Sequence, residues 1–523
     1  MKDANQSGGK QNIALAAFLV LLIAAGAKLI GFVRQAVVAA YFGSNAVTDA
    51  YFFAESLPSM IFPAVCDSIS TAFLAIYVHK LVRSTPEESG SFAANTLLFS
   101  SGVAICFGAI GYLFAPFLVP LLAPGFSSEI TALTVQLSRV VMVALVLNML
   151  IYMFGAVLNA KKIFYLVQAA GVIGNVVIIA LTFALGKHQN IYYLLYTVLF
   201  GHLVQAIVLA AACVRNRSFA RPTAVFNRDT KAVLMAALPI MLSNGIVSVQ
   251  TIVDKYLASG MAEGSVSALS YVTSLNAVVT SVLVASVATV LYPNLSENYA
   301  MHDEEAFVKN ARKGLLTTLL TLTPITLITF TCADNIVYIV YGRGSFDMLA
   351  VENTAKLLRY YALTYPLFGI SAVLTRAFFA TGNMKTPTVI SAAAIGVHIG
   401  CCLLLTNTIG IIGIPISAAL SALISAVLFL AVSPSKGIGL KPKDLAPSMI
   451  RILLSAALTG GGLYGMAQIP IRSDPARFTI MALFGLGVYF GCSALLKCQE
   501  TLELIDLLKR FCRGRIKHNM KNE

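Results

Sequence analysis

Ionisable side chains inside long apolar stretches are the residues of this chain whose types and spacing could do chemistry. Lys28 and Arg34 lie six positions apart in one apolar run, and Asp49 and Asp67 lie in the next run. An ionisable side chain at the centre of a bilayer costs about 2.5–3.5 kcal/mol on insertion scales, so it usually faces a cavity or a partner. On a helix, Lys28 and Arg34 are less than two turns apart. Two cations without an acid beside them predict a site for an anionic group.

Other ionisable residues in the apolar runs have simpler interpretations. Asp49 begins the second run, where it could pair with Arg34, and that pair could be purely structural or part of a functional site. Asp254 and Lys255 are expected near a helix end, where a long lysine side chain reaches water. The remaining residues of this kind are Glu55, Arg139, Lys356, Arg359 and Arg376.

The elements that must position these side chains are transmembrane helices. Hydrophobic residues make up 58% of the chain and charged residues 11%, whereas an ordinary soluble domain is about 25% charged. About 20 mostly apolar residues cross a bilayer core of about 30 Å. We therefore predict an all-α polytopic membrane protein with about fourteen transmembrane helices. Their expected ranges are 12–41, 46–79, 92–122, 129–158, 163–185, 191–214, 231–258, 265–296, 314–341, 349–380, 387–406, 410–433, 447–468 and 476–496.

Basic residues in the predicted loops indicate the orientation. Loops on one side hold sixteen Lys and Arg residues, and the opposite loops hold four. Because cytoplasmic loops carry an excess of Lys and Arg, both termini are expected in the cytoplasm. The net charge of +14 then needs no nucleic-acid partner, since basic loops beside anionic lipid headgroups explain it.

The longest basic loop predicts a division of the chain into two halves. It follows the sixth predicted span, and weak self-similarity relates AYFFAESL (50–57) to ALSYVTSL (268–275). Such repeats place a substrate site at the interface of the halves, near the middle of the membrane. We predict two pseudo-symmetric six-helix bundles and two additional C-terminal helices. The expected boundaries are 1–214 and 231–433 for the bundles, 215–230 for the linker, 434–497 for the additional helices and 498–523 for a basic tail.

The sequence carries no pattern typical of an enzyme. Its nine cysteines form no CxxC pair, and its six histidines form no cluster. It has neither a GxxxxGK[ST] loop nor an HExxH helix, the signatures of phosphate-binding and zinc-dependent hydrolytic sites. We expect no catalytic activity, no cofactor and no metal site.

Five sequence blocks carry a resemblance to a known family. They are KLIGFVRQAVVAAYFGSNAVTDAYFFAESLP (28–58), DKYLASGMAEGSVSALSYVTSL (254–275), SVATVLYPNLS (286–296), YGRGSFD (341–347) and RAFFATGNMKTP (376–387). The chain resembles the MurJ-type lipid II flippases of the multidrug/oligosaccharidyl-lipid/polysaccharide exporter superfamily. The resemblance covers both halves and implies a bacterial inner-membrane protein. Such flippases move an undecaprenyl-pyrophosphate-linked cell-wall precursor across the membrane by alternating access.

The resemblance also implies roles for single residues. Arg34 and Asp49 match an essential arginine and an essential aspartate, Lys28 replaces a further arginine, and Asp67 matches an acidic residue. Phe62 and Ser274 stand where the family has cavity arginines. Lys28 and Arg34 would then clamp the diphosphate, with Lys255 or Arg139 as replacements for the missing cations. The expected substrate-binding residues are Lys28, Arg34, Asp49, Asp67, Arg139 and Lys255.

Several functions stay open at this point. Phe62 and Ser274 favour a flippase for another polyprenyl-linked glycan, such as a capsule or exopolysaccharide unit. A cation-coupled drug antiporter and a transport-inactive scaffold for cell-wall synthesis proteins are further alternatives. The expected partners are lipid II or a similar lipid-linked oligosaccharide pyrophosphate and the bilayer itself. Coupling to the membrane potential or to a monovalent cation is left open by the sequence.

Overall fold

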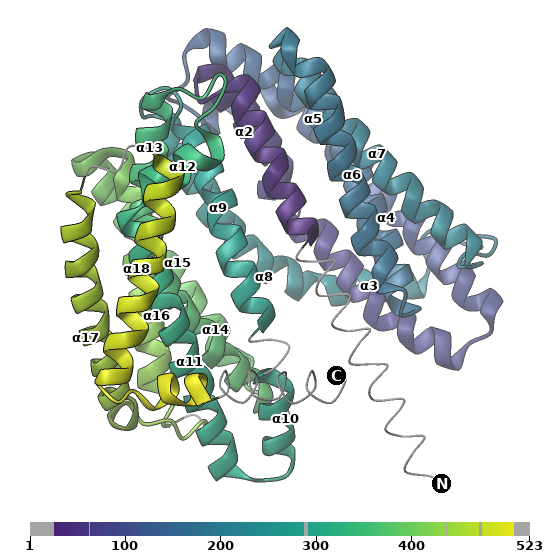
Figure 1. Cartoon of the computed structure of the whole chain (residues 1–523). Coiled ribbons are helices and arrows are strands. Elements are labelled where there is room, and N and C mark those ends of the chain that lie inside the picture. The colour runs from purple at the N-terminus through teal and green to yellow at the C-terminus, as the bar shows by residue number, and fades with distance from the viewer. Residues whose placement is uncertain (1–25, 62, 287–290, 436, 470–472, 507–523) are drawn as a thin grey trace, which may run out of the picture. The chain divides into compact units, whose positions relative to one another are not determined.

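Helices make up all the regular secondary structure in the described part of the chain. The structure is a computed structural model that describes residues 26–61, 63–286, 291–435, 437–469 and 473–506 (Figure 1). A helix over 26–42 is followed by α2 (Ala46–Ile61), α3 (Pro63–Arg83), α4 (Pro86–Leu122), α5 (Ser128–Ala160), α6 (Phe164–Leu185), α7 (Ile191–Arg215), α8 (Arg228–Ser259) and α9 (Ser265–Ser286). The later helices are α10 (Tyr292–Ala300), α11 (Glu304–Thr331), α12 (Ala333–Tyr341), α13 (Met348–Tyr361), α14 (Thr364–Ala380), α15 (Lys385–Ile409), α16 (Gly413–Val432), α17 (Pro442–Ala467) and α18 (Asp474–Leu495).

The chain divides into two compact units. Unit 1 holds the chain up to Val278 together with Tyr341–Ala350, and unit 2 holds Val279–Val340 and the chain from Val351 onwards. In unit 1, α2 packs against α5 and α8, and α3 packs against α5 and α8. In unit 2, α11 packs against α14 and α17, and α15 packs against α16. The helix α8 and most of α9 thus belong to the same unit as the first seven helices.

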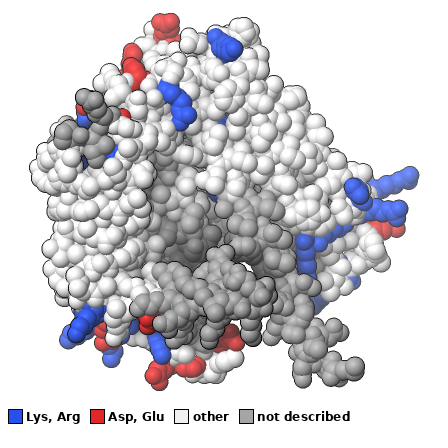
Figure 2. Space-filling model, in the orientation of Figure 1, with Lys and Arg blue, Asp and Glu red and all other residues white. Residues whose placement is uncertain are grey.

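Many helices have the length and composition of membrane spans. Within the described residues, nine helical segments are long and apolar enough to cross a bilayer, and the number rises to eleven if two bent helix pairs each count as one span. The all-helical polytopic class predicted from the sequence is confirmed, and the count of fourteen stays a prediction. On the face shown in Figure 2, the charged side chains form a few groups, with broad uncharged surface between them. An uncharged surface of this kind suits contact with lipid.

Two helices begin earlier than the apolar runs predicted, because polar residues cap them. The helix α4 begins at Pro86 rather than at 92, where Thr85 and Glu88 form a reciprocal capping box. The helix α11 begins at Glu304 rather than at 314, and the side chain of Asp303 accepts a hydrogen bond from the Ala306 N–H. Such caps satisfy N–H groups that the first helical turn leaves without partners. Hydropathy alone does not register these polar first turns.

Two predicted single spans are broken in the structure. The range 349–380 is split into α13 and α14, which meet at a bend of 42°. The range 314–341 is split into α11 and α12, because α11 ends at Thr331 with Cys332 as its C-cap, and α12 begins at Ala333. Long apolar runs do not show where a helix breaks, since buried neighbours can satisfy the freed backbone groups.

Candidate functional site

A polar cavity in unit 1 is the candidate functional site. Its volume is about 480 Å³, and the helix over 26–42, α2, α7, α8 and α9 all contribute to its wall. The lining residues are polar or charged for the most part, although they come from apolar helices. They are Arg34, Gln35, Phe52, Glu55, Ser56, His202, Thr251, Asp254, Lys255, Leu269, Ser270, Thr273 and Ser274.

Arg34 forms an ion pair with Glu55 at the wall of the polar cavity. The guanidinium Nη2 lies 3.8 Å from the Glu55 Oε1, and the two side chains are 19% and 26% exposed. At this distance, two unit charges attract each other by about 4 kcal/mol at an effective dielectric constant of about 20. The prediction that Arg34 pairs with Asp49 is therefore wrong. The expectation that Arg34 has no neighbouring acid is also wrong, because the acid lies on α2 rather than on the helix of Arg34.

Lys255 is the second cation of the polar cavity. Its side chain is buried, at 9% exposure, and its Nζ donates a hydrogen bond of 2.8 Å to the Phe52 carbonyl oxygen. The expectation that Lys255 reaches water at a helix end is wrong, because α8 carries it against α2 in the interior of unit 1. A buried ammonium group needs a compensating partner. The carboxylates of Glu55 and Asp49 supply negative charge near it.

Ser274 also lines the polar cavity, at a position where the family resemblance of the sequence implies an arginine. Its hydroxyl donates to the Ser270 carbonyl oxygen within α9, at 3.0 Å. An arginine at this position would add a cation to the cavity wall, and this chain has Lys255 on α8 instead. Phe62, the other departure from the family pattern, lies outside the described residues.

Asp49 joins the first turn of α2 to the first turn of α9. Its side chain is buried, at 3% exposure. Its Oδ2 accepts a hydrogen bond from the Gly264 N–H at 2.8 Å, and its Oδ1 accepts one from the Ser267 N–H at 2.7 Å. A carboxylate at a helix N-terminus satisfies unpaired N–H groups and is favoured by the helix dipole. Asp49 thus caps a helix that begins more than two hundred residues later in the chain.

Further hydrogen bonds surround this contact, which we call the Asp49 junction (Gly43, Ser44, Asp49, Gly264, Ser267 and Tyr271). The Ser44 hydroxyl donates to the Gly264 carbonyl oxygen at 3.0 Å, and the Tyr271 hydroxyl donates to the Gly43 carbonyl oxygen at 2.9 Å. Gly264 has a φ of +85°, and an added Cβ would lie 2.9 Å from the Ser44 carbonyl oxygen. Glycine is therefore required there both by backbone conformation and by space.

The Asp49 junction closes the polar cavity at one end. Along α2, Phe52 and Glu55 follow Asp49 by about one and two turns, and along α9, Ser270 and Ser274 follow Ser267 in the same way. The two helices therefore meet tightly at their starts and line the polar cavity further along. A separation of the starts of α2 and α9 would break these hydrogen bonds.

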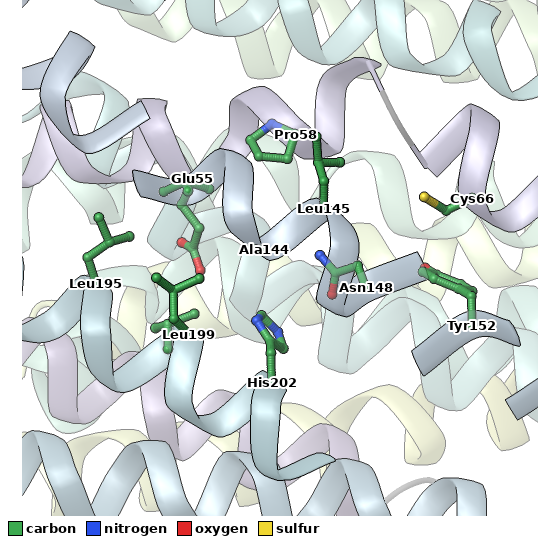
Figure 3. Close-up of a pocket in the computed structure, with 12 residues that line it drawn as sticks. Glu55, Pro58, Cys66, Ala144, Leu145, Asn148, Tyr152, Leu195, Leu199 and His202 are labelled. Carbon is green, nitrogen blue, oxygen red and sulfur yellow. The ribbon is translucent and has the colours of Figure 1, made fainter. Parts of the chain in front are cut away.

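A second, smaller cavity lies beside the polar cavity. This apolar cavity has a volume of about 160 Å³ and lies between α2, α3, α5 and α7. Glu55 and His202 line both cavities. In Figure 3, Glu55 lies toward one end of the apolar cavity, and Cys66 and Tyr152 lie toward the other. The Nδ1 of His202 is buried and has no hydrogen-bond partner among the residues that the structure describes. The Glu55 carboxylate is thus placed between an apolar and a polar space.

The other predicted site residues lie away from the polar cavity wall. Lys28 is exposed on the helix over 26–42 and does not line the cavity. Asp67 on α3 accepts a hydrogen bond of 3.3 Å from the Asn244 side chain. Arg139 on α5 stacks over the Tyr112 ring, and no described residue forms a hydrogen bond with its buried Nε. The structure therefore brings together only Arg34 and Lys255 among the six predicted residues.

Three ionisable residues that line the polar cavity were not among the predicted site residues. Glu55 pairs with Arg34, Asp254 precedes Lys255 on α8, and His202 is contributed by α7. The sequence could have indicated Glu55 and Asp254, because placing an acid of an apolar run in a bilayer costs free energy and such residues mark functional positions. A single histidine in an apolar run carries a weaker signal, since many such residues are structural.

A family model and curated relatives match this chain over most of its length. The family model described as lipid II flippase MurJ matches residues 38–473. A relative from Bdellovibrio bacteriovorus, described as "Probable lipid II flippase MurJ", is 26% identical over 507 residues, which cover 94% of this chain and 96% of the relative. A relative from Burkholderia cenocepacia, described as "Lipid II flippase MurJ", is 26% identical and covers 91% of this chain and 96% of its own length.

Solved structures show the same fold. A structure described as lipid II flippase MurJ in an inward closed conformation matches with a TM-score of 0.79 at 22% identity, and covers 91% of this chain and 98% of that chain. An inward-facing multidrug resistance transporter of the MATE family matches with a TM-score of 0.68 at 14% identity, and covers 81% and 98%. Because the family model matches most of the length of this chain, the chain belongs to the lipid II flippase MurJ family, a family of polytopic membrane transporters.

Proposed function

We propose that this protein moves lipid II from the inner to the outer leaflet of the bacterial cytoplasmic membrane, for peptidoglycan synthesis. Membership of the lipid II flippase MurJ family supports the substrate. The observation that carries the proposal is a polar cavity of about 480 Å³ with two cationic side chains inside otherwise apolar helices. Ionisable groups placed at membrane depth mark substrate pathways.

Arg34 and Lys255 are the residues proposed to bind the diphosphate of lipid II. Arg34 presents a planar fork of donors that matches phosphate oxygens in a bidentate manner, whereas Lys255 acts as a point charge. They come from the helix over 26–42 and from α8, so the diphosphate would be held from two sides of the cavity. Charge-assisted hydrogen bonds of this kind are about twice as strong as neutral ones.

Alternating access requires that the cavity open to one side at a time. We place the starts of α2 and α9 on the outer side of the membrane, as the bias of basic loops predicts. The Asp49 junction then holds the outer side closed in this state of the protein. Translocation would break the junction after the headgroup has entered from the cytoplasmic side, and release of the headgroup would allow it to form again.

Reconstitution tests the proposed function directly. The purified full chain is placed in liposomes that contain fluorescent lipid II, and the fraction of lipid II in the outer leaflet is followed with a reagent that does not cross the bilayer. We expect exchange between the leaflets at a rate at least about tenfold above protein-free liposomes. Liposomes with a polyprenyl-linked glycan of another kind serve as a specificity control. Exchange of that glycan, with no exchange of lipid II, would contradict the proposal.

Depletion in cells gives an independent test. Loss of a lipid II flippase should cause lipid II to accumulate on the cytoplasmic face of the membrane. The expected control is a strain in which depletion is complemented by the unaltered chain. If a different lipid-linked precursor accumulates, the substrate assignment is wrong although a flippase function stands. If no precursor accumulates, transport itself is contradicted.

A further inference from the structure

We propose that Glu55 is a built-in counter-anion of the polar cavity, which takes up one proton when the diphosphate headgroup binds and loses it when the headgroup leaves. The inference rests on the proposed function and deepens it, because it couples substrate movement to proton movement at a named side chain. It starts from the ion pair between the Arg34 Nη2 and the Glu55 Oε1, which are 3.8 Å apart.

The charges that line the polar cavity balance in the absence of substrate. Two cations, Arg34 and Lys255, face two acids, Glu55 and Asp254. A diphosphate esterified at both ends carries about two negative charges, since each phosphate keeps one ionised oxygen. If nothing else changes, its entry leaves the cavity with an excess of negative charge in a space surrounded by apolar helices. Such unpaired buried charge is strongly unfavourable.

Uptake of one proton by Glu55 removes about half of this excess, since the cavity then holds about one unpaired negative charge instead of two. The proton comes from bulk water and adds to a carboxylate oxygen of Glu55, so that the carboxylate becomes a neutral carboxyl group. Arg34 is then released from its acid partner and can donate its fork of N–H groups to the phosphate oxygens. When the headgroup leaves, the carboxyl group returns the proton to water, and the ion pair with Arg34 forms again.

The surroundings of Glu55 suit an acid that must exist in both forms. In the polar cavity the carboxylate faces the cations Arg34 and Lys255, which support its charged form, and the acid Asp254, which opposes it. The same side chain lines the apolar cavity with Cys66, Tyr152 and His202, and this environment supports its neutral form. The Tyr51 hydroxyl, one turn earlier on α2, interacts with Glu55 as well. An acid between a polar and an apolar space is sensitive to a new charge nearby.

His202 is the alternative proton acceptor, because it lines both cavities and its Nδ1 has no hydrogen-bond partner within the described part of the chain. A protonated imidazole would also offset the charge of a diphosphate. It would not, however, release Arg34 from Glu55. The geometry therefore favours Glu55, and the experiment must separate the two residues.

Calorimetry of binding counts the protons. The full chain in detergent is titrated with a short-chain lipid II analogue, whose diphosphate is esterified on both sides and does not titrate near neutral pH. The observed enthalpy is measured in several buffers with different ionisation enthalpies, and its slope gives the number of protons taken up. We expect about one proton for the unaltered chain and close to none for Glu55→Gln. As the pH rises, the affinity of the unaltered chain for the analogue should fall by up to about tenfold per pH unit, which corresponds to 1.4 kcal/mol. The affinity of Glu55→Gln should stay nearly constant over the same pH range.

Two control variants and one independent measurement accompany the titration. Glu129→Gln alters an exposed acid at the start of α5 and should leave proton uptake unchanged. His202→Gln should also leave it unchanged, and loss of uptake in that variant would overturn the assignment to Glu55. Infrared difference spectra should show a new band of a protonated carboxyl group when the analogue binds. This measurement uses only the unaltered chain, so it does not depend on whether a variant folds. Binding without proton uptake contradicts this inference alone, whereas no binding at any pH contradicts the proposed function as well.

Discussion

The carboxylate of Asp49 lies 2.7 Å from the backbone N–H of Ser267, across 218 residues of sequence. Together with the bond from Gly264, it replaces the local N-cap that α9 would otherwise take from its own flanking residues. A buried carboxylate that accepts two N–H bonds is a strong interaction, because each bond to a charged group contributes about 1.5–3 kcal/mol. The first turns of α2 and α9 are therefore held together by a contact that is specific and can still be broken.

Asp49→Ala should weaken the Asp49 junction and expose the polar cavity to the side on which α2 begins. Loss of even one such bond corresponds to at least about a tenfold change in the opening equilibrium. The measurement uses Ser270→Cys, a cavity residue, in a background without native cysteines. An impermeant thiol reagent added from outside should label this cysteine at least about tenfold faster when Asp49 is alanine.

Val47→Ala is the matched control, because Val47 is exposed two residues earlier on α2. It should leave the labelling rate unchanged. Equal rates in Asp49→Ala and in the unaltered background would show that the junction does not hold the cavity closed.

Arg34→Ala should lower lipid II exchange in liposomes by at least about tenfold while the protein inserts and folds. The reason is that Arg34 is the cavity cation with bidentate donors, and Lys255 alone offers only a point charge. Arg34→Lys should keep part of the activity because it retains the charge. Arg83→Ala, at the exposed end of α3, is the control and should exchange lipid II at the normal rate.

A structural role of Arg34 gives a different pattern. If Arg34 serves only to neutralise Glu55, then Arg34→Ala should reduce the amount of folded protein, and the exchange Arg34→Glu with Glu55→Arg should restore transport. Full transport by a well-folded Arg34→Ala variant would contradict both interpretations.

The fold class could be predicted from the sequence because the hydrophobicity of a span is a property of one short stretch of residues. Apolar runs of about 20 residues predict spans wherever they stand, and the family resemblance added their order. Helix ends were less readable, since α4 and α11 begin with polar caps that lie outside the apolar runs. The break at Cys332 between α11 and α12 depends on neighbouring helices and leaves no clear mark in hydropathy.

The site could be predicted only in part, because its contacts join segments that lie far apart in the sequence. Arg34 was found from its charge, but its partner Glu55 was not, since sequence spacing does not tell which helices face each other. Lys255 was assigned to a helix end, whereas packing of α8 against α2 buries it beside the Phe52 carbonyl oxygen. The role of Asp49 as a cap of α9 requires the tertiary fold.

Orientation in the membrane is a prediction from loop charges that labelling can test. Val47 is 40% exposed near the start of α2, and Arg221 is exposed in the segment between α7 and α8. In intact cells, Val47→Cys should react with an impermeant thiol reagent and Arg221→Cys should not, in a background without native cysteines. Permeabilised cells provide the control, since both cysteines should react there. The reverse pattern in intact cells would invert the assigned orientation.

Lys255 and Ser274 should be interchangeable as positions for the second cavity cation. Lys255→Met keeps the volume of the side chain but removes its charge, so lipid II exchange should fall by at least about tenfold. Ser274 lines the same cavity, and the family resemblance of the sequence implies an arginine at this position. Adding Ser274→Arg to the Lys255→Met variant should therefore restore a large part of the exchange rate. Lys187→Met, an exposed lysine after α6, controls for loss of positive charge in general. Normal exchange by Lys255→Met alone, or no recovery with Ser274→Arg in a well-folded double variant, would show that Lys255 does not replace the family's arginine.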